Sequence, residues 1–390
     1  MNIAIITLYN NGNYGASLQA YALNRVVRSL AHECVTVKYK RTFPNSSSNP
    51  NHFTSKLRTV MDKPSLLLSL PALIIMKRVL KHDYQIRQGR FDEFESKNIP
   101  QTSKSYIGSK DVSSIVNDYD AFICGSDNIW NRAAFDPAMM LDFVPINKLK
   151  VSYAAGFSTD TLTQSQKESM LDLIGALDAI SVRESNGRDL LECLLGRKVT
   201  LSPDPTLLLT KEQWMEVSEP VQALPKKYIF CYFMGKQRES REYALNLSKK
   251  LSLPIVTLPH IRDYIKADKH FGDVRSFNIG PGEFITCVAN AEYIVTDAFH
   301  GTIFAILFEK PFLSFNRFFT KVKNELNFRL VNLFNLLGIP NRVVTDNASY
   351  KRVVSETVDY ASVKEKLCQL RQEANDYLTD TLSLIDKKQE

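Results

Sequence analysis

Residues 293–302 read Tyr-Ile-Val-Thr-Asp-Ala-Phe-His-Gly-Thr, a short apolar run that gives way to an aspartate, a histidine and a glycine. An apolar run of this length predicts a buried β-strand, and we expect a helix to begin at Thr302. The turn between them would leave unpaired backbone N–H groups at the positive end of that helix, an arrangement that binds anions. We therefore expect the chemistry of the protein at this turn.

His300 stands in this turn, immediately before Gly301. Its unperturbed pKa of about 6.5 lets a histidine work near neutral pH either as a proton donor or as a cationic clamp. Ligands of open α/β sheets bind beyond the carboxyl ends of the strands, which is where Asp297 and His300 are expected. We take both as catalytic candidates and assign Gly301 and Thr302 to the anion site. The alternative is that His300 only hydrogen-bonds within its own loop.

Short apolar runs alternate with amphipathic stretches through most of the chain, which predicts an α/β fold with mainly parallel sheets and helices on both faces. Strands are expected at residues 3–8, 34–39, 121–124, 151–155, 179–182 and 199–201, and then at 228–233, 255–258, 293–296 and 311–315. Because the pattern starts again after Asp204-Pro205, two similar halves are expected.

The 390 residues are enough for two domains. We expect an N-terminal domain over residues 1–205 and a second domain over residues 206–345. Residues 346–390 are polar with apolar residues at helical spacing, so we expect a helical tail that packs back across both domains.

The net charge of +7 is concentrated between His52 and Arg90, where eight basic residues meet two acidic ones. The apolar part of this segment, Pro64–Met76, is interrupted by Pro71 and is shorter than the roughly 18 residues that a membrane-spanning helix needs. Residues 52–90 therefore either lie on an anionic membrane surface or pack on the protein with their charges in solvent. No nucleic-acid reader motif accompanies the charge, so no nucleic-acid partner is expected.

Six scattered cysteines have no metal-ligand spacing, so we expect reduced core thiols and no metal. The chain starts directly with a strand-like run and lacks the pattern of a signal peptide. The sequence thus predicts a cytoplasmic protein.

The first strand runs into a glycine-containing loop, Gly12-Asn13-Tyr14-Gly15, ahead of a helix near residues 17–30. The glycines allow a ligand to approach the backbone, and Ser17 or a neighbour can cap the helix. The loop resembles a phosphate or sugar loop but matches neither a Walker loop nor a dinucleotide fingerprint. We expect Asn13, Tyr14, Gly15 and Gln19 to contact this phosphate or sugar.

A second polar cluster, Gly125-Ser126-Asp127-Asn128-Ile-Trp130, follows the strand at 121–124. Amides and hydroxyls bond sugar hydroxyls, and an aromatic face covers the apolar side of a sugar ring. We predict Ser126, Asn128 and Trp130 as acceptor contacts and Asp127 as a candidate base. The alternative is a capped turn with a core tryptophan.

Arg183 ends the run at 180–182, and its planar guanidinium suits a carboxylate or a phosphate. We predict that it binds an anionic donor. The alternative is a plain pair with its neighbour Glu184.

Six segments in this order resemble the polysaccharide pyruvyl transferase family. They are Gly12-Asn-Tyr-Gly-Ala-Ser-Leu-Gln-Ala20, Gly125-Ser-Asp-Asn-Ile-Trp130, Tyr153-Ala-Ala155, Ser181-Val-Arg-Glu184, Asp204-Pro-Thr-Leu-Leu208 and Thr296-Asp-Ala-Phe-His-Gly-Thr302. The likeness spans residues 3 to 315. It implies two Rossmann-like domains facing a cleft, as in the GT-B glycosyltransferases, and a donor held by His300 and the arginine-bearing strands.

The resemblance also implies phosphoenolpyruvate as donor substrate, no further cofactor, and a sugar acceptor that receives a pyruvate ketal during surface polysaccharide biosynthesis. The acceptor is either free or lipid-linked, and a lipid-linked one would fit a peripheral position on the inner face of the membrane. Where relatives can carry an arginine two positions before the histidine, this chain has Ala298.

Two other functions remain open from the sequence. One is a nucleotide-sugar-dependent glycosyltransferase, because a two-domain cleft could hold such a donor. The other is a noncatalytic membrane-surface protein of polysaccharide assembly, in which residues 52–90 carry the function. Under the pyruvyl transfer hypothesis, His300 protonates the donor, and either Asp127 or Asp297 takes the hydroxyl protons.

Overall fold

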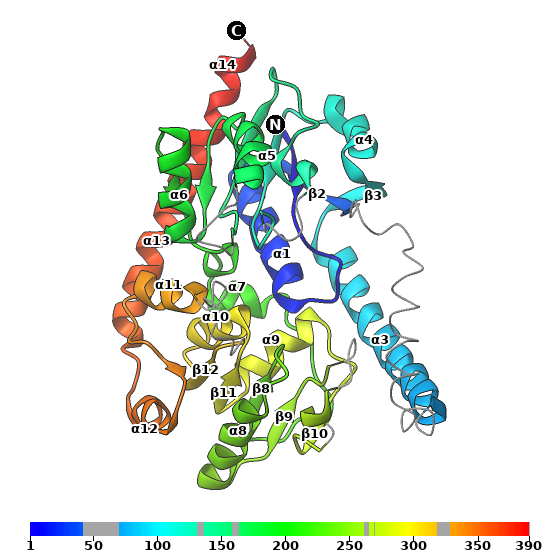
Figure 1. The fold of residues 1–390 in the computed structure, drawn as a ribbon, viewed down its shortest axis with the longest axis vertical. Helices are drawn as coiled ribbons and strands as arrows, with labels where there is room; N and C mark the ends of the chain where they lie inside the picture. Colours follow the sequence, from blue (N-terminus) through cyan, green and yellow to red (C-terminus); the bar gives the residue numbers. More distant parts are fainter. Residues whose placement is uncertain are drawn as a thin grey trace.

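The computed structural model describes residues 1–41, 70–130, 136–157, 164–260, 265–268, 270–317 and 328–389. Two parallel sheets lie one above the other along the long axis, with helices on both faces (Figure 1). The prediction of an α/β fold with parallel sheets is therefore confirmed.

The first sheet has the strand order β3-β2-β1-β4-β5, and every neighbouring pair is parallel. Its strands are β1 (Asn2–Ile6), β2 (Glu33–Lys40), β3 (Gln101–Ile107), β4 (Ala121–Cys124) and β5 (Leu149–Ser152). A short parallel pair, β6 (Ser181–Val182) with β7 (Thr200–Leu201), continues beyond β5 through bridges from Val151 and Ala155. The helices of this unit are α1 (Tyr14–Ser29), α3 (Leu70–Asn98), α4 (Gly108–Val112), α5 (Gln164–Gly175) and α6 (Ser185–Leu195).

The second sheet has the order β10-β9-β8-β11-β12-β13 and is also parallel throughout. Its strands are β8 (Ile229–Tyr232), β9 (Ile255–Thr257), β10 (Val274–Arg275), β11 (Tyr293–Thr296), β12 (Phe312–Phe315) and β13 (Val343–Val344). Its helices are α7 (Lys211–Met215), α8 (Arg238–Leu251), α9 (Pro281–Ala289), α10 (Phe299–Leu307), α11 (Phe328–Leu337) and α12 (Asn347–Ser355).

Helix α1 joins the two units, because it packs on α9 and α10 of the second while belonging to the first (Figure 1). Thirteen of its sixteen residues are buried, and one core cluster runs through both units at this place. The first turns of α1 and α10 are thereby brought together, which creates the site described below.

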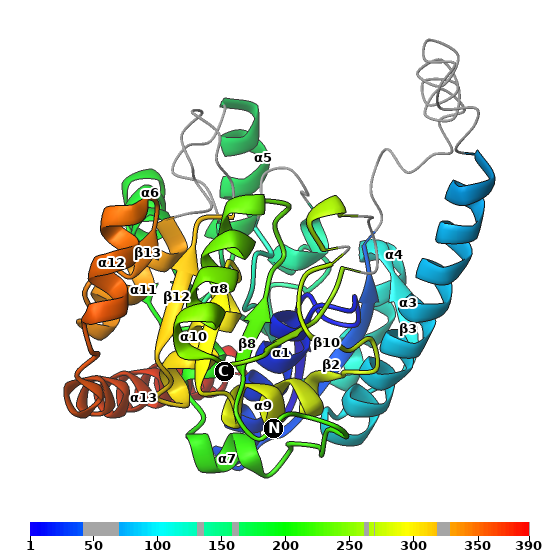
Figure 2. The ribbon, with the colours of Figure 1, turned by 90° about the horizontal axis from the view of Figure 1, so that it is seen from below.

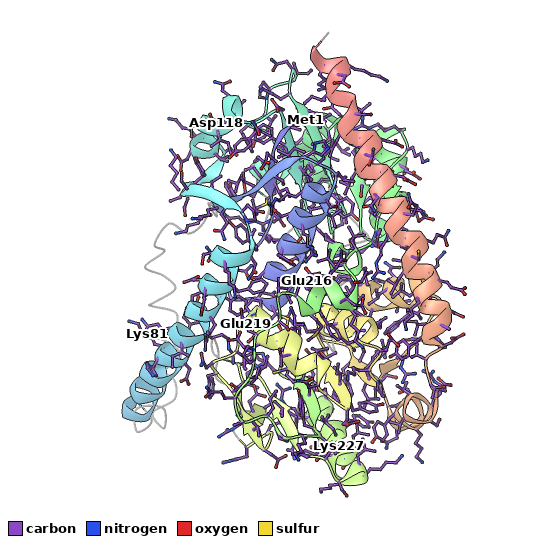
Figure 3. All side chains as sticks on the ribbon, turned by 180° about the vertical axis from the view of Figure 1, so that it is seen from behind. Met1, Lys81, Asp118, Glu216, Glu219 and Lys227 are labelled. Atoms are coloured by element: carbon purple, nitrogen blue, oxygen red, sulfur yellow. The ribbon has the colours of Figure 1, made fainter. Side chains whose placement is uncertain are left out.

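The C-terminal helix α13 (Tyr360–Leu382) runs back along the molecule from the second unit to the first (Figure 3). The Arg371 guanidinium donates to the carbonyl oxygens of Leu207 and Leu209, and the Tyr377 hydroxyl donates to that of Ser152 at 2.9 Å. The short α14 (Asp386–Gln389) follows, and Lys388 bonds the Ile146 carbonyl. The helical tail thus contacts both units.

Helix α3 begins away from the body and then runs along the side of both units (Figures 1 and 2). Arg87 is buried and donates to the carbonyl oxygens of Pro259, Ser276 and Phe277 in the second unit. Arg90 donates to Asn278 at 2.8 Å. Both cations connect α3 to the second unit. Arg87 is buried, which corrects the prediction of a surface charge at this position, while 38% of the Arg90 side chain is exposed. The part from His52 to Ser69 lies outside the described residues.

Four of the cysteines are buried as predicted, but Cys193 and Cys368 are exposed, so the prediction of core thiols is wrong for these two. Each sits on the outer face of an amphipathic helix, α6 or α13, where the packing does not require an apolar residue. Among the helices that the structure describes, none combines the length and apolar content needed to span a bilayer.

A candidate active site between the two sheets

Helix α10 begins at Phe299, three residues earlier than expected. The Thr296 hydroxyl accepts a hydrogen bond from the Ala298 N–H at 3.0 Å, and the Ala298 carbonyl accepts from the Thr302 N–H at 3.0 Å. These bonds close the first helical turn directly after the strand. His300 therefore lies in the first turn of the helix, where backbone N–H groups have no partner within the helix and attract anions.

The His300 side chain is held between the two units. Its Nε2 lies 3.4 Å from Oδ2 of Asp204, and its ring lies against Gly15 in the first turn of α1. A β-carbon at position 15 would overlap the ring, so the close approach requires glycine. The Asn13 side chain, rather than Ser17, caps α1 by accepting from the Gly15 N–H at 3.1 Å.

Asp204 is a buried carboxylate that the sequence did not single out as a site residue. Its Oδ2 accepts from Nη1 of Arg183 at 2.7 Å, and its Oδ1 accepts from the N–H and hydroxyl of Thr206. Burial alone would raise the pKa of Asp204, but the neighbouring His300 and Arg183 outweigh burial and hold it well below its usual range. Asp204 is therefore ionised near neutral pH.

Arg183 is almost completely buried, with 3% of its side chain exposed. Besides Asp204, it donates through Nε to Glu184 at 3.1 Å, and its Nη1 lies 3.9 Å from Asp127. Its guanidinium sits over the Phe299 ring, 4.8 Å from the centroid. Burial lowers the pKa of Arg183, but the three carboxylates raise it by more than burial lowers it, so the net shift is upward. The carboxylates of the protein hold Arg183 in place.

A small cavity of about 50 Å³ collects side chains from both units; we call it the central cavity. Its lining is Asn13, Gly15, Asp127, Tyr232, Met234, Asp297, Ala298, Phe299, His300, Arg317 and Arg329. The structure thus brings together five of the predicted residues, from loops that are far apart in the sequence.

Arg317 and Arg329 are the cations of this lining that sequence reasoning missed. Arg317 follows β12, so the strand-end rule that selected Asp297 could have found it. Arg329 opens α11 and lies 5.5 Å from the centroid of Phe299, on the ring that also carries Arg183. Burial, and after it the charge of Arg183, lowers the pKa of Arg329 to about 10. Arg329 therefore remains charged near neutral pH, and the two guanidinium groups make the cavity attractive to an anion.

A sequence model of the polysaccharide pyruvyl transferases matches residues 13–317 of the chain. The chain belongs to this family. The match covers every residue of the central cavity except Arg329. No curated protein matches the sequence.

Among solved structures, this pyruvyl transferase family member is similar to two UDP-N-acetylglucosamine 2-epimerases. The enzyme from Methanocaldococcus jannaschii has a TM-score of 0.54 at 12% identity, over 92% of this chain and 93% of that one. The enzyme from Rickettsia bellii has a TM-score of 0.56 at 11% identity, over 99% and 97%. At such identities the likeness shows a shared fold.

Asp297 lines the central cavity of the transferase, but both of its oxygens are engaged. They accept hydrogen bonds from the N–H groups of Met234 at 2.6 Å and Gly235 at 2.8 Å. Burial raises the pKa of Asp297 against the lowering effect of these bonds. The carboxylate thereby ties the end of β11 to the end of β8.

Several predicted binding residues of the transferase lie in the core instead of the central cavity. The Tyr14 hydroxyl donates to the Ile279 carbonyl at 2.7 Å, and the Trp130 indole N–H donates to that of Met139 at 2.9 Å. Gln19 bonds Thr7 and the main chain, and the Ser126 hydroxyl donates to the Ala154 carbonyl. All four side chains are buried. For Trp130 the geometry matches the alternative of a capped turn with a core tryptophan.

Two residues predicted to bind the donor substrate, Gly301 and Thr302, and one predicted to bind the acceptor, Asn128, also lie outside the lining of the central cavity. Thr302 is buried, and its hydroxyl bonds the Ala298 carbonyl and Ser314. Gly301 packs against the side chain of Thr296. Asn128 is half-buried and does not line the central cavity. The groups of this turn that can still bind an anion are the backbone N–H groups in the first turn of α10.

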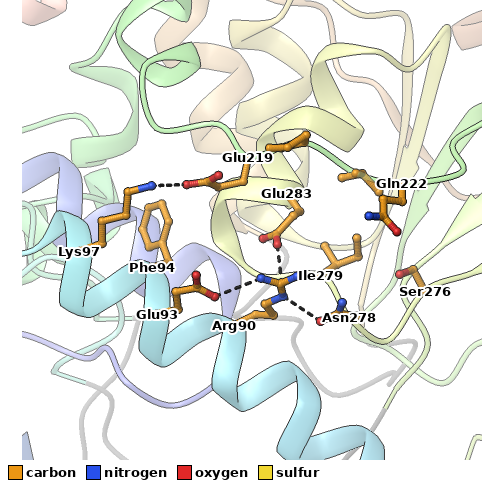
Figure 4. A pocket seen from close by; sticks show the side chains of 12 residues that line it. Arg90, Glu93, Phe94, Lys97, Glu219, Gln222, Ser276, Asn278, Ile279 and Glu283 are labelled. Atoms are coloured by element: carbon orange, nitrogen blue, oxygen red, sulfur yellow. Dashed lines mark hydrogen bonds and ion pairs between the residues drawn. The ribbon is translucent and has the colours of Figure 1, made fainter.

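A larger cavity, of about 650 Å³, lies between α3 and the second unit (Figure 4). Its charged groups pair with one another, as in the contacts of Lys97 with Glu219 at 2.5 Å and of Arg90 with Glu283 at 3.5 Å. It contains none of the residues of the central cavity, so its size does not make it the site of the chemistry.

Proposed function

We propose that the protein transfers the pyruvyl group of phosphoenolpyruvate to two hydroxyls of one sugar and forms a pyruvate ketal during surface polysaccharide biosynthesis. Family membership supports the transfer of a pyruvyl group. The observation that carries the proposal is the convergence of the His300–Asp204 pair with Arg317 and Arg329 at the first turn of α10.

Phosphoenolpyruvate has a phosphate and a carboxylate on adjacent parts of a small molecule. Two guanidinium groups and the N–H groups of a helix start suit two such anions. Arg317 and Arg329 supply the charge near Ala298, where the family resemblance leads one to look for an arginine. Phosphoenolpyruvate enters as a substrate, and the scheme uses no further cofactor.

His300 is the proposed general acid. The carboxylate of Asp204 faces Nε2 at 3.4 Å and orients the ring for this role. Transfer of a ring proton to the methylene carbon of the donor makes it a methyl group and leaves a cationic centre on the neighbouring carbon. A sugar hydroxyl then attacks that carbon.

The bond between this carbon and the bridging phosphate oxygen breaks, and phosphate leaves with the electron pair. A second hydroxyl of the same sugar attacks and closes the ketal. Of the two hydroxyl protons released, one replaces the proton given to the methyl group and the other leaves with the phosphate. We propose Asp127 as the group that takes them, because the oxygens of Asp297 already accept backbone hydrogen bonds.

The proposal is tested by phosphate release from phosphoenolpyruvate with galactose-, glucose- and mannosamine-containing acceptors. We expect acceptor-dependent release from the wild type and a loss of at least about 100-fold in kcat for His300→Ala. His260→Ala is the matched control, since His260 bonds Asp268 and the Met234 carbonyl and does not line the central cavity. Normal turnover by His300→Ala would remove the histidine from the mechanism.

The fold likeness to enzymes named for UDP-N-acetylglucosamine makes a nucleotide-sugar donor the second candidate. Against it, Asp297 already bonds the N–H groups at the end of β8, where a diphosphate could otherwise bind. We expect UDP to bind weakly. Turnover of a nucleotide sugar without phosphate release from phosphoenolpyruvate would favour this candidate.

A lipid-linked acceptor would bring the protein to an anionic membrane surface. The support for this proposal is the basic and apolar sequence of residues 52–90 together with the projecting start of α3 (Figure 2). Salt-sensitive binding to phosphatidylglycerol vesicles tests it. Binding to vesicles without any turnover of phosphoenolpyruvate would instead support a noncatalytic assembly protein.

A further inference from the structure

A second cavity, of about 140 Å³, adjoins the central cavity and shares Phe299 and Arg329 with it; we call it the side cavity. It lies between the β6–β7 region of the first unit and α11 of the second. Its lining is Arg183, Glu184, Ser185, Leu201, Asp204, Leu207, Phe299, Arg329, Asn332, Leu333, Asn335 and Leu336. Its volume is on the scale of a single sugar ring.

Helix α11 supplies two amides, Asn332 and Asn335, which lie on the same side of the helix because they are three residues apart. The Ser185 hydroxyl donates to Oδ1 of Asn332 at 3.3 Å. The Nδ2 of Asn332 is buried and finds no hydrogen-bond partner within the described part of the chain. A buried donor without an acceptor destabilises the folded protein, so a ligand oxygen at this place is favoured.

Arg183 also lines the side cavity. Its side chain is 3% exposed, Nη1 and Nε are bonded, and Nη2, which has no hydrogen-bond partner among the described residues, lies beside Gly156. The carboxylates of Glu184 and Asp204 balance the charges of Arg183 and Arg329, so the lining has no net charge to attract an anionic ligand. Neutral oxygens, which accept from the amide and guanidinium and donate to carboxylates, suit this lining best.

We infer that the side cavity is the subsite for the acceptor sugar, an inference that rests on the proposed pyruvyl transfer. Amide, hydroxyl and guanidinium groups bond sugar hydroxyls, and the leucines from the two units face the apolar side of a ring. Five of the seven residues expected from the sequence to bind this sugar are buried, so the acceptor needs a different set of side chains.

The position of the side cavity suits the reaction. Phe299 lies in its wall, while the next residue along α10, His300, lines the central cavity. Asp204 lines the side cavity and touches His300 at 3.4 Å. Because Arg183 and Arg329 both pack on the Phe299 ring, the shared wall is fixed in place. A sugar bound there has its hydroxyls at the border of the proposed donor position.

The test compares Asn332→Ala and Asn335→Ala with Val331→Ala, which changes an exposed residue of the same helix that lines neither cavity. In phosphate-release assays we expect each asparagine variant to raise the acceptor KM about tenfold, as for one lost hydrogen bond. The KM for phosphoenolpyruvate and the melting temperature should stay unchanged. An unchanged acceptor KM in both asparagine variants would overturn the inference.

A binding measurement separates this inference from the proposed reaction. Saturation-transfer NMR with methyl β-galactoside, methyl β-glucoside and methyl N-acetyl-β-mannosaminide reports sugar binding without turnover. Binding that Asn335→Trp abolishes and Val331→Ala retains supports the sugar subsite even if phosphoenolpyruvate proves not to be the donor. Binding that is absent in the wild type, or unaffected by Asn335→Trp, refutes the subsite and leaves the reaction to be judged by phosphate release.

Discussion

The ring of His300 rests directly on Gly15, so the first turn of a helix from one sheet unit touches the first turn of a helix from the other. The contact brings the glycine loop at residues 12–15 to the central cavity. It also means that the orientation of the histidine depends on a residue near the other end of the family match.

Gly15→Ala tests this contact. The added methyl group would overlap the imidazole, so the ring has to leave its present position, and we expect kcat to fall by at least about 100-fold. Gly89→Ala in α3 is the control, because a β-carbon there meets nothing within 4 Å and should leave activity unchanged. Wild-type kcat in Gly15→Ala would show that the position of the ring is not critical.

Asp204→Asn should preserve the shape of the site while removing the charge next to Nε2 of His300. The carboxylate that faces Nε2 of His300 and pairs with Arg183 is then lost, so we expect a roughly tenfold or larger loss of kcat at neutral pH. Thr206→Val, which removes a hydrogen bond to Asp204 but keeps its charge, should leave kcat close to that of the wild type. Equal kcat values for the two variants would contradict the proposed role.

Arg317→Gln and Arg329→Gln should each raise the KM for phosphoenolpyruvate by about 10- to 100-fold, because each removes one cation from the central cavity. Arg352→Gln is the control, since this exposed arginine pairs with Glu356 on α12. Steady-state kinetics at two ionic strengths provide the measurement. A KM that moves equally in all three variants would point to a nonspecific charge effect.

Glu95 on α3 predicts a pH dependence of stability. It is buried, and Ser17 and the Asn10 N–H bond it, yet burial raises its pKa from 4.5 to about 7. The folded state therefore binds more protons than the unfolded state between these two values, so stability falls as the pH rises from about 4.5 to about 7 and then levels off.

The contribution of Glu95 over this window is on the order of 3 kcal/mol. Glu95→Gln should remove that part of the slope, while Glu93→Gln, at an exposed position on the same helix, should keep it. Urea unfolding at several pH values measures both slopes. A Glu95→Gln slope equal to that of the wild type would refute the assignment.

Most strands were predictable because each is a short apolar run, and the pattern also placed Asp297 and His300 at the end of β11. The pattern missed β3, whose sequence is mostly polar, and the two-residue strands β10 and β13. The start of α10 could not be predicted, since it depends on the Thr296 hydroxyl closing the turn. Arg329 gave no local signal, as it joins the site only when α11 packs beside Phe299.

Trp130 was predicted to contact a ligand but lies in the core, whereas Asp204 belongs to the site but was not predicted. Polar and aromatic neighbours made Trp130 look like a ligand contact, although its indole fills the core. Asp204 marked only the point after which the strand pattern starts again; one of its oxygens caps a turn, and the other meets Arg183 and His300. Which of these functions a side chain serves depends on contacts between distant segments.

The bonds that Arg87 makes across the molecule bear on how the protein unfolds. Helix α3 follows the first sheet in the chain, yet this buried guanidinium satisfies three carbonyls of the second unit. If either unit melts alone, the other loses these bonds and exposes the surface that the contact covered. The two halves should therefore lose their structure in one cooperative transition, although each has a complete sheet of its own.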